Sequence, residues 1–391
     1  MKMVGDFFSF QNGYAFKSKD FVREGKYKIV KIKELKDGLV KFFDDTAEVD
    51  LPDNFNFDKY IIRKGDVLFA LTGDPVNKPN PLSWVGRVAY YNYDEPALLN
   101  QRVCKAVPKT DIPSDFLYYF FRQNSEFYRL ASKATGSASQ ANISTKTIEQ
   151  HNINIPDIEN VNKIVTFLKN IDDKILYNNQ INRNLLDQAM ALYEGMILDA
   201  IEECSEGVLS DIADIVMGQS PKGDTYNEDG AGTVFYQGRA EFGERFPTQR
   251  LFTTAPKRMA KENSVLMSVR APVGDVNVAY EECCIGRGLC SVASKDNHQS
   301  FILYTMYGLK DKFDVYNGEG TVFGSINKDS MNCMTIQIPN KTLMDRFEEI
   351  VSPMDAIIKA NYDENCRLIA VRDSLLPKLM SGELDVSDLN V

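Results

Sequence analysis

The stretch IPDIENVNKIVTFLKNIDDKILYNNQINRNLLDQAMALYEGMILDAIEEC, residues 155–204, decides the fold because a related stretch runs from residue 338 to the C-terminus. Both copies open with Ile-Pro, at Ile155 and Ile338, and they align without a gap. In the first copy, apolar residues recur at helical spacing, namely Ile164, Leu168, Ile171, Ile175, Leu185, Ala189, Leu192 and Met196. A helix of about 40 residues is roughly 60 Å long. Such a stripe needs a partner helix, so we predict that the two copies pair as an antiparallel coiled coil.

Four asparagines interrupt the two stripes at equivalent positions, namely Asn178, Asn182, Asn361 and Asn365. In an antiparallel pair these amides meet near the middle of the helices. A buried asparagine opposes slipped registers, because a slip leaves an amide without a partner. The alternative is that the four side chains lie at the edge of the stripe in water. The sequence leaves both interpretations open.

The repeat predicts four segments in chain order. Residues 1–154 form a first globular domain, 155–206 a central helix, 207–337 a second globular domain, and 338–391 a C-terminal helix with a tail. The two globular domains share short equivalences, which are Asp6 with Asp211, Val67-Leu68 with Val265-Leu266, Val85-Gly86 with Val273-Gly274, residues 99–102 with 285–288, and 142–144 with 325–327. The predicted fold class is therefore mixed α/β (α+β), with an internal pseudo-two-fold repeat.

Local patterns predict individual elements within this plan. We expect strands at residues 27–35, 66–71 and 85–91, and one helix over residues 114–130 with Ser114 as its N-cap. The first long helix should end between Glu202 and Gly207. In the second copy, Ser352-Pro353 predicts a helix start or a kink, and Pro377 should end the apolar stripe.

Composition excludes several classes of protein. The chain has 391 residues, 43% of them hydrophobic, and it has neither a long apolar run nor a signal-peptide core, so a cytoplasmic protein without a membrane segment is expected. The seven cysteines form no Cys-x-x-Cys pair, and the two histidines, His151 and His298, stand in no triad pattern. No phosphate-binding glycine loop or metalloprotease motif occurs. We therefore predict no enzymatic activity, no cofactor and no metal.

Charge is distributed unevenly along the chain, whose net charge is −10. Residues 1–160 hold 22 Lys and Arg against 21 Asp and Glu, a balance of +1. The helical segments 161–206 (4 against 8) and 341–391 (6 against 10) are each at −4, and residues 207–340 (13 against 16) are at −3. Nearly neutral domains can still present a basic face, while acidic helices suit a protein partner better than DNA.

Three short sequence motifs, taken together with the repeat, resemble those of one protein family. They are the opening Gly13-Tyr14-Ala15-Phe16-Lys17-Ser18, its counterpart Gly218-Gln219-Ser220-Pro221, and the ending Leu375-Leu376-Pro377-Lys378-Leu379-Met380-Ser381-Gly382-Glu383-Leu384-Asp385. The whole chain resembles the specificity subunit of type I restriction-modification enzymes. The resemblance implies two target-recognition domains joined by helices whose length sets the spacing, and a bipartite double-stranded DNA target. It further implies a subunit without catalysis that docks methyltransferase and restriction subunits.

Candidate DNA contacts follow from side-chain chemistry, because Arg and Lys suit guanine, Asn and Gln suit adenine, and small hydroxyls suit phosphates. In the first domain the candidates are Tyr14, Lys17, Thr72, Lys78, Arg87, Gln101, Arg102 and Ser139. In the second they are Ser220, Lys222, Gln237, Arg239, Arg270 and Arg287. For each of them, a salt bridge or an ordinary solvated position is the alternative.

Two other functions remain open at this point. A self-contained enzyme such as a DNA methyltransferase would need cofactor and catalytic motifs that the sequence lacks. A protein-binding adaptor with duplicated ligand-binding domains is favoured by the acidic composition. Salt-dependent, sequence-selective DNA binding distinguishes DNA recognition from the adaptor.

Overall fold

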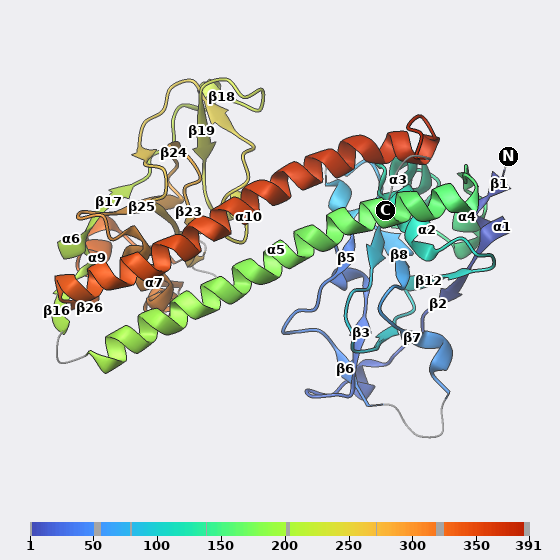
Figure 1. The fold of residues 1–391 in the computed structure, drawn as a ribbon, viewed down its shortest axis with the longest axis horizontal. Helices are drawn as coiled ribbons and strands as arrows, with labels where there is room; N and C mark the ends of the chain where they lie inside the picture. The colour runs from blue at the N-terminus through green and yellow to red at the C-terminus, as the bar shows by residue number, and fades with distance from the viewer. Residues whose placement is uncertain are drawn as a thin grey trace. The chain divides into compact units, whose positions relative to one another are not determined.

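The computed structural model describes residues 2–50, 56–78, 80–137, 139–200, 204–270, 272–317 and 324–386. The chain forms two compact units, each built from a globular part and portions of two long helices (Figure 1). Unit 1 contains residues 1–176 and 365–391, and unit 2 contains residues 177–364. The long helices are α5 (Ile158–Asp199) and α10 (Lys341–Ser381), and both contribute to each unit.

Unit 1 is built on β-sheets with short helices against them. The largest sheet has the order β2 (Phe8–Asn12), β12 (Val103–Pro108), β8 (Val67–Ala70), β10 (Val88–Tyr90), β5 (Leu39–Val40) and β4 (Leu35–Lys36). A second has the order β6 (Glu48–Val49), β3 (Tyr27–Val30), β11 (Ala97–Leu99) and β7 (Ile61–Ile62). Smaller sheets pair β13 (Thr135–Ser137), β14 (Gln140–Asn142) and β9 (Thr72–Gly73), and β1 (Lys2–Met3) with β15 (Asn152–Ile153). The helices are α1 (Val4–Phe7), α2 (Ser114–Arg122), α3 (Asn124–Ala131) and α4 (Thr145–Glu149).

Unit 2 repeats the centre of this topology, although its described residues form no counterpart of β4 and β5. One sheet has the order β17 (Ala213–Met217), β25 (Leu289–Ser294), β22 (Val265–Val269) and β23 (Val273–Val278). The other has the order β18 (Tyr226–Asn227), β20 (Phe252–Thr253), β19 (Thr233–Tyr236), β24 (Cys283–Ile285) and β21 (Met259–Ala260), while β16 (Cys204–Val208) pairs with β26 (Thr335–Pro339). The helices are α6 (Leu209–Ile212), α7 (Gln299–Gly308), α8 (Lys310–Asp314) and α9 (Lys328–Asn332). In both units a parallel pair, β3 with β11 and β19 with β24, is followed by an antiparallel neighbour.

The equivalences predicted from the sequence occupy matching places in this topology. Asp6 accepts a hydrogen bond from the Met3 N–H at 2.8 Å, and Asp211 accepts one from the Val208 N–H at the same distance. The side chains of Ser144 and Asn327 cap α4 and α9. Because these local bonds depend on the same chemistry at the same place, the predicted duplication of the fold is confirmed.

The two long helices pack antiparallel, as predicted. In unit 2, Asn178 of α5 bonds Glu364 of α10, and Asn182 bonds Asn361, so residue numbers rise along one helix as they fall along the other. In unit 1, the start of α5 shares a core with the end of α10. Helix α5 ends at Asp199; Glu202 lies outside the described residues, and Gly207, predicted to end the helix, belongs to strand β16.

The helix start predicted at Ser352-Pro353 is wrong, because α10 begins at Lys341 and continues through Pro353 and Pro377. Both prolines are exposed, as are Glu349 and Asp373, the residues four positions earlier. The carbonyls that lose a helical donor therefore face water, which can replace the missing bond. The apolar stripe also continues past Pro377, since Leu379 and Met380 are buried.

Two local predictions also differ from the structure. The strand predicted over residues 27–35 ends at Val30, where a short 3-10 turn follows and Leu35 joins another sheet. The helix predicted over residues 114–130 is two helices, because Gln123 adopts an extended backbone and its buried side chain donates to the Phe120 carbonyl at 3.0 Å. Ser114 is the first helical residue rather than the N-cap, which is Pro113.

An aspartate on each helix repeat anchors the neighbouring globular part. In unit 1, Asp172 accepts a hydrogen bond from the Tyr119 hydroxyl at 2.9 Å and forms an ion pair with Arg372 at 2.6 Å. In unit 2, Asp355, the counterpart of Asp172 in the sequence repeat, accepts one from the Tyr304 hydroxyl at 2.9 Å and pairs with Arg245. Each globular part is thus held on a long helix by the same kind of contact, in which an aspartate binds a tyrosine hydroxyl and an arginine.

A buried histidine joins unit 2 to the first turns of α10. His298 is 4% exposed, its Nε2 lies 2.7 Å from Asp345 and its Nδ1 lies 2.9 Å from Asp296. Burial alone lowers the pKa of His298, but the hydrogen bond to Asp345 and the attraction of the Asp296 carboxylate outweigh it and raise the pKa above its ordinary value. Each ring nitrogen faces a carboxylate and only the imidazolium is positively charged, so the folded state favours the protonated ring.

Replacing Asp355 with asparagine should lower the free energy of unfolding by about 3 to 5 kcal/mol, because Arg245 then keeps a buried charge without its carboxylate. Urea unfolding followed by circular dichroism measures this. Glu262→Gln is the matched control, since its ion pair with Lys359 joins side chains that are 59% and 38% exposed, and we expect less than about 1 kcal/mol there. Equal losses in the two variants would contradict the anchoring role.

The stability of unit 2 should fall as pH rises above the ordinary histidine pKa of about 6.5. A raised folded-state pKa means that the stabilisation by His298 is complete below that value and is lost as pH passes through the raised pKa. His151 does not contribute in this window, since its burial lowers its pKa. Urea midpoints at several pH values measure the fall, and His298→Gln should flatten it. An unchanged slope in that variant would refute the assignment.

Candidate nucleic-acid interface

In unit 1, four loops meet where the strands of the main sheet end, and we call this the unit 1 loop end (residues 13–14, 71–73, 99–103 and 142–143). The Gly13 N–H donates to the Val103 carbonyl at 3.1 Å, and the Leu71 N–H donates to the Arg102 carbonyl at 2.9 Å. The Ile143 N–H closes the group on the Leu71 carbonyl at 2.9 Å. Backbone hydrogen bonds therefore connect these loops to one another.

The unit 2 loop end (residues 218–220, 269–270, 285–289 and 325–326) has the same connections. The Gly218 N–H donates to the Leu289 carbonyl at 2.9 Å, and the Val269 N–H donates to the Gly288 carbonyl at 2.9 Å. The Ile326 N–H donates to the Val269 carbonyl at 3.2 Å. These bonds pair the positions of the two units one to one, so that Thr72 corresponds to Arg270.

The opening glycine of each motif is required by a close backbone approach. A Cβ atom on Gly13 would lie 2.1 Å from the Asn100 carbonyl oxygen, and one on Gly218 would lie 2.1 Å from that of Gly286. Any side chain at either position would push the loops apart. Glycine is thus required by sterics at the first position of both motifs, Gly13-Tyr14 and Gly218-Gln219.

The unit 1 loop end carries a closed polar group. The Arg102 guanidinium donates to Thr72 Oγ1 at 3.1 Å and to Asn142 Oδ1 at 3.3 Å, and the Thr72 hydroxyl donates to Asn142 at 2.9 Å. Thr72 is 4% exposed, so it holds Arg102 rather than facing solvent. Arg102 itself is exposed, and so is its neighbour Gln101.

The same positions of the unit 2 loop end carry different side chains. Arg270 and Arg287 are exposed, and neither side chain has a hydrogen bond or ion pair within the described ranges. The Ser220 hydroxyl accepts the Arg287 N–H at 3.3 Å, and the Gln237 carbonyl accepts the Gly288 N–H at 3.2 Å. An open guanidinium, Arg270, thus stands at the position of Thr72, and a second one, Arg287, at the position of Gln101.

The remaining candidates lie in adjoining loops or turn elsewhere. Lys17, Lys78, Ser139 and Lys222 are exposed, and Tyr14 is half-buried in an aromatic cluster with Phe16, Phe57 and Tyr60. Two arginines point away from the loop ends. Arg239 pairs with Asp275, and the Arg87 guanidinium donates to the Leu82 carbonyl while burial lowers its pKa.

Two basic segments were missed when charge was counted over whole domains. Residues 17–41 hold nine Lys and Arg against four Asp and Glu, a balance of +5. Residues 239–261 hold six against two, a balance of +4. Lys28 lies over the Phe42 ring and Lys31 over the Phe21 ring, while Lys257 and Arg258 are exposed. A window of about 25 residues would have found both segments.

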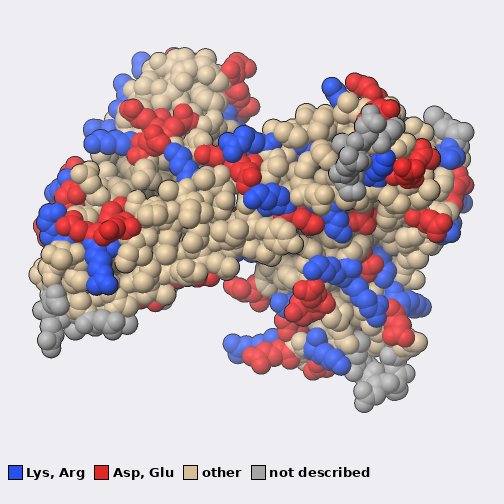
Figure 2. Space-filling view, viewed as in Figure 1, with Lys and Arg blue, Asp and Glu red and all other residues tan. Residues whose placement is uncertain are grey.

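Charge on the face shown in Figure 2 does not form a single basic surface. Lys and Arg side chains are interspersed with Asp and Glu over both units. An interface for a polyanion on this face would therefore rest on particular loops rather than on a continuous positive field.

The four helix asparagines differ in their partners. Asn361 donates to Asn182 at 2.8 Å, which is the amide pair expected of a register contact. Asn178 is fully buried and donates to the Glu364 carboxylate at 2.8 Å, while Asn365 is 7% exposed. Asn178 and Asn365 therefore do not lie in water at the edge of the stripe; a role of the four in register stays a prediction.

No metal site or membrane span is found within the described ranges. They hold no group of three or more His, Cys, Asp or Glu side chains arranged for a metal ion. No helix among them is both long and apolar enough to cross a membrane.

Fold and loops together define a duplicated protein, in which two units present different side chains from equivalent loops. The family described as the type I restriction modification DNA specificity domain matches residues 1–186 and 202–366. The chain belongs to this family, which confirms the resemblance inferred from its motifs.

Relatives and a solved structure agree with this assignment. The putative type I restriction enzyme MjaX specificity subunit of Methanocaldococcus jannaschii is 35% identical over 176 residues, 44% of this chain and 41% of that protein. The MjaIX specificity subunit of the same organism is 30% identical over 93 residues, 24% of this chain and 22% of that protein. The chain thus aligns with less than half the length of these relatives. The type I restriction-modification S subunit from M. genitalium shares the fold, with a TM-score of 0.61 at 15% identity over 97% of this chain and 95% of that one.

Proposed function

We propose that this chain is a specificity subunit without catalysis that reads a two-part double-stranded DNA sequence, one half-site per globular domain. The two loop ends support this most directly, because equal backbone connections carry different exposed side chains. Arginine fits the O6 and N7 acceptors of guanine, and glutamine fits adenine. Gln101 and Arg102 in unit 1, and Arg270 and Arg287 in unit 2, supply such donors.

Contacts to phosphates would come from the basic segments beside the loop ends. Lys17 belongs to the segment 17–41, and Lys257 and Arg258 to the segment 239–261. Such contacts position a protein on DNA without reading its sequence and make binding salt-dependent. In this proposal residues 1–154 and 207–337 are the reading domains, and segments 155–206 and 338–391 form the spacer between them.

Methyltransferase and restriction subunits are the proposed protein partners, docked on the long helices. Helix α10 exposes Ile350 and Ile357, which are 42% and 46% exposed and seven residues apart, so they lie on one face. The segments that contain the helices are also acidic, each at −4. An apolar stripe with acidic surroundings suits a protein partner better than a nucleic acid.

The experiment that tests DNA recognition is selection from a pool of random duplexes by the chain together with a methyltransferase subunit of its own system. We expect an enriched bipartite motif with a fixed gap. Arg287→Ala should relax one base preference in one half only, by about 1 to 3 kcal/mol, because a bidentate contact to one base is removed.

Arg239→Ala is the matched control, since Arg239 is exposed but paired with Asp275, and it should leave the motif unchanged. Loss of preference in both halves after Arg287→Ala would argue against one domain per half-site. If no motif is enriched while the complex still forms, the protein-binding adaptor replaces DNA recognition.

Charged substitutions on the exposed face of α10 should prevent subunit docking. We expect Ile350→Glu with Ile357→Glu to weaken capture of the methyltransferase subunit at least about tenfold, because two carboxylates would be desolvated in the interface. Val315→Glu is the control, since Val315 is 81% exposed and lies outside the long helices. Pull-down with circular dichroism measures capture and helix content. Unchanged capture would place the docking surface elsewhere.

A further inference from the structure

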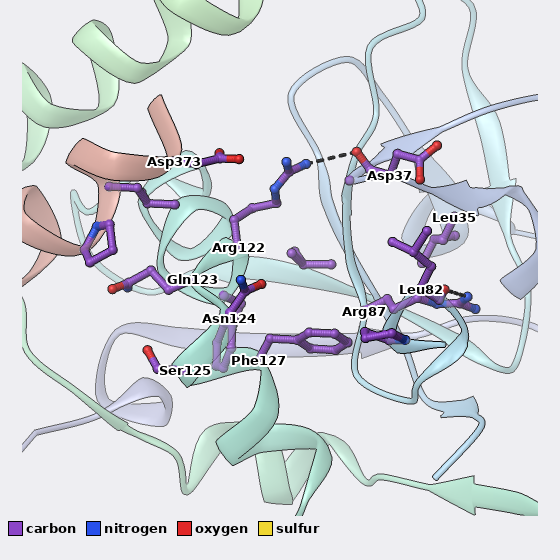
Figure 3. Close-up of a pocket in the computed structure, with 16 residues that line it drawn as sticks. Leu35, Asp37, Leu82, Arg87, Arg122, Gln123, Asn124, Ser125, Phe127 and Asp373 are labelled. Atoms are coloured by element: carbon purple, nitrogen blue, oxygen red, sulfur yellow. Dashed lines mark hydrogen bonds between the residues drawn. The ribbon is translucent and has the colours of Figure 1, made fainter. Parts of the chain in front are cut away.

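A cavity of about 550 Å³ lies within unit 1 and includes no residue of the loop end. Its walls are the turn at 37–38 between β4 and β5, the loop 81–88, the α2 to α3 junction at 121–127, and the last turns of α10 (Figure 3). Sites for small molecules span about 300 to 1,000 Å³ and combine apolar walls with a few fixed polar groups. This cavity has both properties.

Arg122 is the fixed polar group. Its Nη1 donates to the Asp37 carbonyl at 3.0 Å and to the Tyr118 hydroxyl at 3.1 Å. Gly38, with φ at +82°, allows this approach, because a Cβ atom there would lie 1.6 Å from Nη1. Nε and Nη2 have no hydrogen-bond partner in the described part of the chain, so the edge that grips a carboxylate or phosphate with two bonds is open.

The carboxylates beside the cavity are already paired with other cations. Asp37 lies 3.2 Å from Lys41, and Asp373 lies 2.8 Å from Arg372. The charge of Arg122 is therefore balanced by no carboxylate of its own among the described residues. Arg87 adds a second guanidinium to the wall; its Nε is buried without a hydrogen-bond partner.

The junction of α2 and α3 adds donors beside Arg122. Helix α3 begins at Asn124, and its N-cap Gln123 provides no side-chain cap, since the amide bonds the Phe120 carbonyl instead. The first N–H groups of α3 therefore remain available next to the guanidinium, where an anion is favoured. Asn124 and Ser125 also line the cavity.

Apolar side chains form the other wall. Phe127 lies across the floor of the cavity in Figure 3, and Leu82 stands at its rim, 61% exposed. Phe127, Leu82 and Arg122 line the same cavity, so a flat ring on the two apolar side chains and an anion at Arg122 can belong to one ligand. The arrangement suits an anion carried on a planar apolar body.

We propose that this cavity is a binding site for a nucleoside monophosphate. Arg122 and the start of α3 hold the phosphate, and Phe127 and Leu82 receive the base. The site is independent of the proposed DNA contacts, because it shares no residue with either loop end.

Isothermal titration calorimetry of the full chain with AMP tests the site, with adenosine and inorganic phosphate as separate probes. We expect AMP to bind one to one, and each of its parts to bind more weakly. Arg122→Gln should weaken AMP binding about ten- to a hundredfold, since charge-assisted bonds are lost. Arg23→Gln, at an exposed arginine outside the cavity, should leave the affinity unchanged.

Leu82→Glu provides a second variant whose folding is not in question, because Leu82 is exposed. Its carboxylate at the rim should repel AMP and weaken binding at least about tenfold. Arg287→Ala, at the unit 2 loop end, should not change AMP affinity. Absence of AMP binding at millimolar concentration overturns the proposal, and so does binding that survives Leu82→Glu, whether or not Arg122→Gln folds.

Discussion

The docking of each globular part depends on one carboxylate of the helix repeat. Asp172 and Asp355 each accept a hydrogen bond from a tyrosine hydroxyl, which belongs to α2 in unit 1 and to α7 in unit 2. A partly buried carboxylate costs several kcal/mol unless its partners are in place. The arginine that balances the charge comes from α10 in unit 1 and from a loop in unit 2. The carboxylate on the helix and its contact with a tyrosine are thus common to both units. The arginine that neutralises the carboxylate comes from a different element in each unit.

The shared backbone structure allows the two loop ends to carry different side chains. Their positions are set by bonds between backbone groups and by the close approach at Gly13 and Gly218, none of which depends on the neighbouring side chains. A threonine at position 72 and an arginine at position 270 therefore occupy one structural position without a change of fold. Recognition can change by substitution at such places while the core that carries them stays intact.

The long helices and the duplication were predictable because helical periodicity and a constant offset are properties of the sequence itself. The effect of Pro353 was not, since it depends on whether the carbonyl four residues earlier faces water. The break at Gln123 likewise depends on a bond that forms only when its side chain is buried. For the candidate site, the open arginines of unit 2 were found from side-chain chemistry. The burial of Thr72 and the hydrogen bond of the Arg87 guanidinium to the Leu82 carbonyl depend on neighbours in three dimensions, which no local sequence pattern encodes.

The hydrogen-bond partners of each arginine show whether its charge is neutralised within the fold or remains able to bind an anion. Arg372 and Arg245 contact carboxylates, so their charges are balanced within the fold and they serve packing. Arg122 is held as firmly, but by a carbonyl and a hydroxyl that carry no formal charge. Fixing a guanidinium with neutral acceptors leaves its attraction for an anion intact and removes the entropy that a mobile side chain would lose on binding. Such pre-organised, unbalanced charge beside an apolar wall is what distinguishes a binding cavity from a gap in the packing.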